Sequence, residues 1–131
     1  MSDTKNLSLM IEKKFVENSE KQRFLIRKAD KYISVSVDDV HCFYARNRIN
    51  FLMTNDNKSF VIDETIEQLE NNLNPEDFFR INRSCIVAYA GIQEVSVHPS
   101  NRLKIRLNNS DADMYVAKER VKDFKKWIGG N

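Results

Sequence analysis

The sequence predicts a mostly β domain, sandwich-like in its sheets, with two or three short helices. Short runs rich in Val, Ile, Phe and Tyr recur along the chain and are separated by turn-forming residues. Two segments carry the three-and-four spacing of an amphipathic helix. At 131 residues, with 41% hydrophobic and 31% charged residues, the chain has the size and composition of one globular domain.

Residues 1–22 are polar and charged, with a short apolar patch that fits neither a long helix nor a clean strand. We therefore expect a linker or partly ordered N-terminal segment over residues 1–22. The domain itself is predicted to span residues 23–129.

The first half of the domain is predicted to be strands. Ile33, Val35 and Val37 alternate with serines, which is typical of a half-buried strand. Residues 55–57 are Asn-Asp-Asn, a turn-rich tripeptide that predicts a hairpin between its flanking runs. The β-prone runs in this half are residues 24–26, 33–37, 40–45, 50–54 and 58–62.

A short amphipathic helix is predicted over residues 65–73, because apolar residues recur there at spacings of three and four. Thr65 and Gln68 form a capping-box pattern at its start. Pro75 is expected to end it.

The run from Phe78 to Val87 mixes aromatic and β-branched residues with cations, and we predict that it is one strand. Alternation would place Arg83 on the same face as Ile81 and Cys85. The apolar residues of this run are assigned to the core, namely Phe78, Phe79, Ile81, Ile86 and Val87.

The last third predicts three more strands and a helix. Leu103, Ile105 and Leu107 alternate with cations and mark a strand with one buried face. Phe124 and Trp127 are expected to pin the closing helix to the sheet. The predicted strands are residues 92–97, 103–107 and 114–116, the turns are 98–101 and 108–113, and the helix runs from Ala117 to Ile128.

The sequence gives little support to catalysis. His41 and His98 stand in no pattern that binds metal or activates a nucleophile. Asp38 and Asp39 are adjacent on a strand end and would point to opposite faces. Three glycines, none in a glycine-rich loop, exclude a phosphate-binding loop. We predict that the chain is not an enzyme and holds no metal or cofactor.

Cys42 and Cys85 fall in predicted strands and are interpreted as small core residues rather than a disulfide or a zinc ligand pair. No apolar run is long enough to span a membrane, and the N-terminus lacks a signal-peptide pattern. These features predict a cytoplasmic protein without a membrane partner.

Nucleic-acid binding has better support, although the net charge is only +2. A DNA reader needs cations for phosphates and forked or amide side chains for base edges. Each candidate segment taken alone is better explained as a solvated loop or helix face, and only the three together favour DNA binding. The third segment lies at the expected start of the last helix, whose N-terminus would attract a phosphate. The three segments are Arg46, Asn47, Arg48 and Asn50; Asn82, Arg83 and Ser84; and Lys118, Arg120 and Lys122.

The sequence of residues 78–87 resembles the central motif of the LytTR family, the DNA-binding domain of many bacterial response regulators. The shared pattern is a paired Phe, Arg-Ile, a polar residue, Arg-Ser and Ile-Val. The likeness runs in order from Phe24 to Ile128. It implies a mostly β fold that places loops in successive major grooves and binds pairs of short direct repeats. Asn82 stands where the family most often has His, which implies a different preferred sequence.

Carried over by position, the resemblance implies DNA contacts from three segments and a double-stranded DNA partner. It further implies a receiver domain or sensor kinase in the intact two-component system, and a homodimer on DNA. Residues 1–22 cannot contain a receiver domain, so we expect either a stand-alone regulator or an excised output domain. The alternative is a non-enzymatic protein-interaction or small-ligand-binding β module. The implied contacts are Arg46, Asn47, Arg48, Asn50, Asn82, Arg83, Ser84, Lys118, Glu119 and Arg120.

Overall fold

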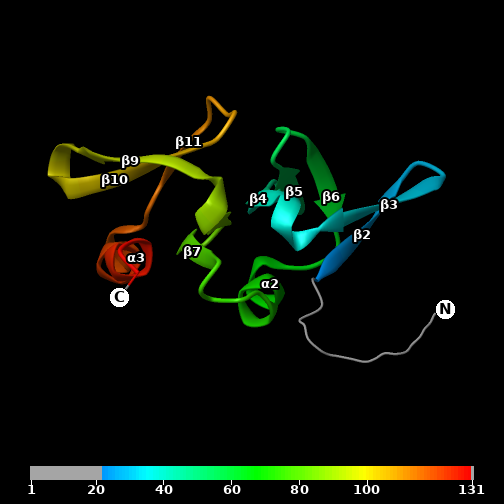
Figure 1. Cartoon of the computed structure of the whole chain (residues 1–131), viewed down its shortest axis with the longest axis horizontal. Helices are drawn as coiled ribbons and strands as arrows, with labels where there is room; N and C mark the ends of the chain where they lie inside the picture. Colours follow the sequence, from blue (N-terminus) through cyan, green and yellow to red (C-terminus); the bar gives the residue numbers. More distant parts are fainter. Residues whose placement is uncertain (1–21, 131) are drawn as a thin grey trace. The chain divides into compact units, whose positions relative to one another are not determined.

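The computed structural model describes residues 22–130, and contacts divide the chain between Asp38 and Asp39 into two compact units (Figure 1). The linker predicted over residues 1–22 lies, apart from Gln22, outside the described residues.

The described part of the first unit is an antiparallel hairpin of β2 (Arg23–Lys28) and β3 (Lys31–Ser36). Val37, predicted as the end of the second strand, instead begins a 3₁₀ turn, Val37–Asp39. The hydroxyl of Ser36 accepts a hydrogen bond from the Asp38 N–H at 3.3 Å, and such local bonds compete with strand pairing.

An antiparallel five-stranded sheet in the order β6-β5-β4-β8-β7 opens the second unit. The predicted hairpin around residues 55–57 is confirmed, since β5 pairs with β6 and the Thr54 N–H donates to the Lys58 carbonyl at 2.8 Å. The strands are β4 (Val40–Arg46), β5 (Ile49–Thr54), β6 (Ser59–Ile62), β7 (Phe78–Asn82) and β8 (Cys85–Ala88).

The prediction of a single strand from Phe78 to Val87 is wrong, because β7 ends at Asn82 and β8 begins at Cys85. The Asn82 side chain accepts a hydrogen bond from the Ser84 N–H at 2.8 Å, a local bond that turns the chain. Apolar residues stand on both sides of the turn, so the alternation could not reveal it. Arg83 therefore lies in a turn rather than on a strand face.

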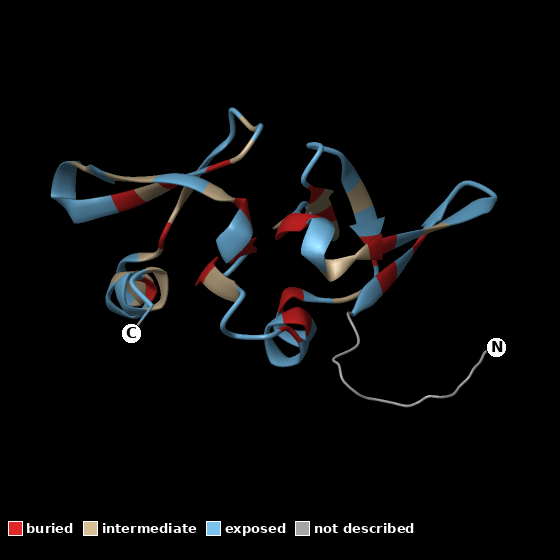
Figure 2. Ribbon diagram, viewed as in Figure 1, coloured by how far each residue is buried: buried red, intermediate tan, exposed pale blue. Residues whose placement is uncertain are grey.

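The first predicted helix is confirmed as α2 (Ile66–Asn72), between β6 and β7. Thr65 caps it, and the reciprocal bonds between Thr65 and Gln68 form the predicted capping box. The helix buries Ile66 and Leu69 (Figure 2).

A second, three-stranded antiparallel sheet has the order β11-β10-β9. Burial alternates along β10 as the sequence predicted, with Leu103, Ile105 and Leu107 inside (Figure 2). The remaining elements are β9 (Ile92–His98), β10 (Arg102–Leu107), β11 (Asp113–Tyr115) and α3 (Val121–Ile128).

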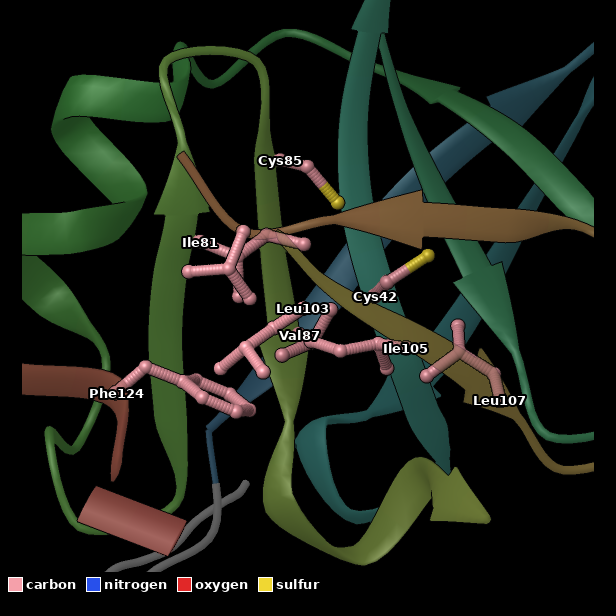
Figure 3. Close-up of a cluster of buried hydrophobic side chains, with 9 residues drawn as sticks. Cys42, Ile81, Cys85, Val87, Leu103, Ile105, Leu107 and Phe124 are labelled. Carbon is pink, nitrogen blue, oxygen red and sulfur yellow. The ribbon is translucent and has the colours of Figure 1, made fainter. Parts of the chain in front are cut away.

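The two sheets and α3 share one hydrophobic core, which confirms the predicted mostly β, sandwich-like fold class (Figure 3). Phe124 is fully buried, and the Trp127 ring lies 5.3 Å from that of Phe79, so the predicted attachment of the last helix is confirmed. Ile81, Ile86 and Val87 are buried as predicted, whereas Phe78 and Phe79 are only half-buried. The core cluster comprises Cys42, Ile81, Cys85, Val87, Leu103, Ile105, Leu107, Val116 and Phe124.

Candidate nucleic-acid interface

Two turns that carry predicted DNA contacts are neighbours at one end of the five-stranded sheet. β4 pairs with β8 so that Tyr44 lies opposite Cys85, and the Ala45 N–H donates to the Ser84 carbonyl at 2.9 Å. The β4–β5 turn and the β7–β8 turn are thus brought side by side by strand pairing.

The β4–β5 turn is a two-residue connection formed by Asn47 and Arg48. Their φ angles are 53° and 67°, the left-handed pair that a type I′ turn requires. Both side chains are exposed, and the Arg46 guanidinium lies 5.9 Å from the centre of the Tyr44 ring. Asn50 follows in β5, where it pairs with Ala45 and Ile62.

The β7–β8 turn is formed by Arg83 and Ser84, and Asn82 holds it. The Asn82 Oδ1 accepts from the Ser84 N–H, and its Nδ2 donates to the Tyr115 carbonyl at 2.9 Å. The Arg83 side chain is exposed and makes no hydrogen bond or ion pair with any residue in 22–130. The turn therefore presents one free guanidinium on a fixed backbone.

The segment after β11 is bonded directly to β7. The Ala117 N–H donates to the Ile81 carbonyl at 2.8 Å, and the Arg120 Nη1 donates to the Arg80 carbonyl at 3.2 Å. The prediction that Lys118, Arg120 and Lys122 begin the last helix is confirmed for Lys122, in the first turn of α3, whereas Lys118–Arg120 forms a 3₁₀ turn that leads directly into it. Lys118 and Glu119 remain exposed.

A groove of about 920 Å³ joins the three predicted segments. Arg46, Asn82, Ser84 and Lys118 all line it, although they span more than seventy positions of the sequence. Apolar and aromatic side chains line it as well, among them Tyr44, Met53, Cys85, Met114, Tyr115 and Val116. The other predicted contacts do not line the groove, namely Asn47, Arg48, Asn50, Arg83, Glu119 and Arg120.

Ser100 and Arg102 also line this groove and were not predicted as site residues. The Arg102 guanidinium lies 4.1 Å from the centre of the Tyr115 ring, a close cation–π contact. The one available signal was the alternation of β10, which puts Arg102 on the same exposed face as Lys104 and Arg106. The pairing of β10 with β11, which brings that face to the groove, is not visible in the sequence.

The two thiols are structural. Cys42 and Cys85 are free and buried, which confirms their interpretation as small core residues. A hydrogen bond with Cys42, together with burial, raises the pKa of Cys85 well above its ordinary value, so its thiol stays protonated and is a poor nucleophile. Within residues 22–130 no three His, Cys, Asp or Glu side chains gather as a metal site, and no helix there has the length and apolarity to cross a membrane.

Comparison with known proteins points to one family. The model of the LytTr DNA-binding domain matches residues 30–129. The transcriptional regulatory protein YpdB of Escherichia coli K12 is 28% identical over 98 residues, which cover 75% of this chain and 40% of that protein. YpdB of Shigella flexneri gives the same values. The chain thus spans about 40% of the length of these curated relatives.

A solved structure gives the same fold. The LytTr DNA-binding domain of a Bacillus cereus protein described as a methyl-accepting/DNA response regulator superposes with a TM-score of 0.75 at 18% identity. The match covers 84% of this chain and 99% of that one. The matched family is defined by DNA binding and the curated relatives are regulators, which confirms the prediction of a non-enzymatic protein.

Proposed function

The chain belongs to the LytTR family of DNA-binding domains, and from this premise we propose that it reads double-stranded DNA sequence-specifically through loops in the major groove. The observation that carries the proposal is the meeting of three candidate contact segments, distant in sequence, along one groove. The surface offers both cations for phosphates and forked or amide groups for base edges.

Arg83 is the residue that we propose reads a base. Its guanidinium has no partner among residues 22–130, whereas its backbone is fixed by the bonds of Asn82 to Ser84 and Tyr115. An Arg presented in this way can form the two parallel hydrogen bonds that recognise guanine. The Ser84 hydroxyl lies next to it in the turn and supplies a second polar contact.

The other candidate residues are assigned to phosphates, to bases or to support of the loops. We assign Arg46, Asn47, Arg48 and Lys118 to phosphates, with Asn50 adding an amide beside the first turn. Glu119 is exposed, and a carboxylate in this place accepts from the amino group of cytosine. The Asn82 amide bonds to the Tyr115 carbonyl and the Ser84 N–H, and the Arg120 Nη1 donates to the Arg80 carbonyl, so we assign both residues to holding the loops rather than to touching DNA.

The wider setting is part of the same proposal. YpdB is a transcriptional regulatory protein, and this chain matches 40% of its length. We propose that the domain is the output part of a cytoplasmic two-component response regulator, with a receiver domain in the intact protein and a sensor kinase acting on it. Two copies would occupy direct repeats about one helical turn apart, which is roughly 10 base pairs.

A protein-interaction or small-ligand module is the second candidate, because the groove is lined partly by apolar side chains. Such a module would present an apolar patch without cations beside it. Here Arg46, Arg102 and Lys118 line the groove next to those apolar residues, so DNA binding is the better supported function.

The test is enrichment of a randomised duplex DNA pool by the purified chain, followed by sequencing, near physiological salt. The expected result is a short motif repeated about one helical turn apart. Arg83→Ala should lose the motif, while Arg106→Ala, which removes an arginine that faces Asp113 and lies outside the three candidate segments, should keep it. Equal weak retention of all sequences by the unaltered chain would refute sequence-specific reading.

A further inference from the structure

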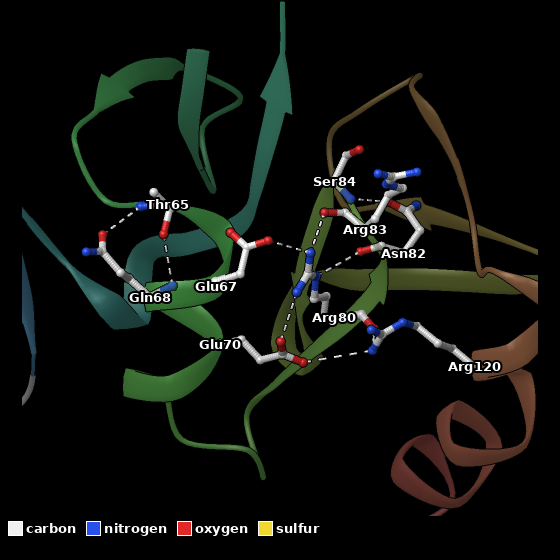
Figure 4. Close-up of polar contacts among 9 residues, drawn as sticks. All are labelled: Thr65, Glu67, Gln68, Glu70, Arg80, Asn82, Arg83, Ser84 and Arg120. Atoms are coloured by element: carbon white, nitrogen blue, oxygen red, sulfur yellow. Dashed lines mark hydrogen bonds and ion pairs between the residues drawn. The ribbon is translucent and has the colours of Figure 1, made fainter. Parts of the chain in front are cut away.

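Arg80, in the middle of β7, is a charged residue whose side chain is only 10% exposed. Its guanidinium makes four hydrogen bonds, all within the protein (Figure 4). A buried guanidinium is costly unless its donors are paired, and here four of its five N–H donors are. Arg80 is thus committed to the interior and is not available to touch DNA.

Two of these bonds anchor Arg80 to α2. Nη1 donates to the Glu70 carboxylate at 3.0 Å, and Nη2 donates to the Glu67 carboxylate at 3.3 Å. Residues three apart lie on one face of a helix, so both acids point the same way from α2. A hydrogen bond from its own backbone N–H, and then the charge of Arg80, lower the pKa of Glu67, which keeps its carboxylate ionised.

The other two bonds reach the β7–β8 turn. Nε donates to the Asn82 carbonyl at 3.3 Å, and Nη2 donates to the Arg83 carbonyl at 2.6 Å. Arg80 therefore connects an acidic helix face to the backbone of the two residues that aim the Arg83 side chain. In Figure 4 the Arg80 guanidinium lies between the two glutamates and this turn.

A second arginine supports this arrangement from the closing segment. The Arg120 Nη1 donates to the Arg80 carbonyl at 3.2 Å and lies 3.9 Å from the Glu70 carboxylate. Glu70 thus faces two arginines, and the strand that carries Arg80 is held at its backbone as well as its side chain.

We propose that Arg80 is a positioning residue for DNA recognition: anchored by Glu67 and Glu70, it fixes the turn carbonyls and so sets the direction of Arg83. The inference rests on the proposed function and deepens it. Lys cannot replace Arg80, because one ammonium group cannot present donors in the fork that these four acceptors require.

A double-mutant cycle tests the proposal, with Arg80→Lys, Arg83→Ala and the combined variant measured against the enriched duplex and a scrambled duplex at several salt concentrations. Arg80→Lys should weaken specific binding by about fivefold to a hundredfold, the range for losing one bidentate base contact. It should leave scrambled-duplex binding and the salt dependence unchanged, because no phosphate contact is lost. In the Arg83→Ala background its cost should fall below about twofold.

Two results would overturn the proposal. An equal cost of Arg80→Lys with and without Arg83 would mean that the two residues act independently. A shallower salt dependence in Arg80→Lys would mean that Arg80 touches phosphate itself. Arg106→Lys is the matched control, since Arg106 is also an arginine on a strand but bonds to no carbonyl of the turn.

A measurement without DNA separates failure of this inference from failure of the proposed function. Amide hydrogen exchange of Ser84, whose N–H donates to the Asn82 side chain, should be faster in Arg80→Lys, with the amides of β10 unchanged as an internal check on folding. Unchanged exchange in the turn would refute the positioning role. If the unaltered chain enriches no sequence, the proposed function fails, and the exchange result still decides whether Arg80 holds the turn.

Discussion

The β4–β5 turn and the β7–β8 turn lie side by side but are held in opposite ways. The first depends on its own hairpin ladder, with Asn47 and Arg48 in the left-handed region. The second is tied to α2 through Arg80 and to the segment after β11 through Asn82. Among residues 22–130 the first turn makes no side-chain hydrogen bond to another element, whereas the second is braced from two directions.

This difference suggests that the two turns have different roles in DNA binding. Base reading needs a side chain whose direction is fixed, because a bidentate pair fails when its donors are misaligned. Phosphate contact tolerates adjustment, because charge attraction is not strongly directional. The braced turn carries Arg83, and the unbraced turn carries Arg46 and Arg48. Variants of each turn can break or sharpen this contrast.

The largest expected effect comes from replacing the arginine of each turn with lysine. Arg83→Lys should weaken binding to the enriched duplex by about 1–3 kcal/mol, because the fork needed for a base edge is lost. Arg48→Lys keeps the charge for a phosphate and should change binding by less than about twofold. Titrations of both variants on one duplex measure the two affinities. Equal losses of affinity would contradict the idea that one turn reads a base and the other contacts phosphates.

Asn82→Ala should remove a brace and lower the free energy of unfolding by about 1–2 kcal/mol, because the Ser84 N–H and the Tyr115 carbonyl lose their partner. Chemical denaturation measures this cost. Asn50→Ala, at an amide for which the structure gives no side-chain hydrogen bond within residues 22–130, is the control and should cost less. If Asn82→Ala left the free energy of unfolding unchanged, the brace would not be needed for stability.

Arg48→Gly should act in opposite directions on stability and binding. Glycine adopts a φ of 67° without the strain that a side chain causes, so the variant should be more stable by about 0.5–1 kcal/mol. The loss of one cation should reduce the slope of log affinity against log salt by about 0.9. Thermal unfolding and salt titration test the two effects, and a loss of stability would show that Arg48 makes a favourable contact.

The smallest effect concerns pH and the far end of β4. Burial lowers the pKa of His41, opposed by a hydrogen bond with the backbone of Asn108. Below the ordinary histidine pKa of 6.5 the unfolded chain binds more protons than the folded chain, so stability should fall as the pH drops through this range. Thermal unfolding at pH 7.5 and pH 5 should show the fall, and His41→Gln should reduce it. If the pH dependence of stability were unchanged in His41→Gln, that dependence would come from other titratable groups.

Local patterns predicted much of this molecule, and pairings distant in sequence were not predictable. The capping box at Thr65, the hairpin at residues 55–57 and the alternation of β10 each depend on neighbouring residues and are confirmed. The turn at Arg83 was missed because one side-chain bond from Asn82 overrides an otherwise strand-like run.

The candidate site shows the same limit. The three segments were recognised by composition and by resemblance, but the groove that joins them depends on how β4 pairs with β8 and on how residues 115–120 bond to β7. The commitment of Arg80 to Glu67 and Glu70 is likewise invisible in a sequence, where an arginine in a DNA-binding motif is easily taken for a contact.

The bonds from Tyr115, Ala117 and Arg120 back to β7 also set an order of events during synthesis. Each joins residues more than thirty positions apart, so the later partner leaves the ribosome well after the β7 residue that it contacts. A nascent chain that ends before Tyr115 can pair β4, β5 and β8 and can form the bonds of Arg80, yet it lacks the second brace of the β7–β8 turn. On the proposed mechanism, the β7–β8 turn is fully braced only once residues 115–120 have been synthesised.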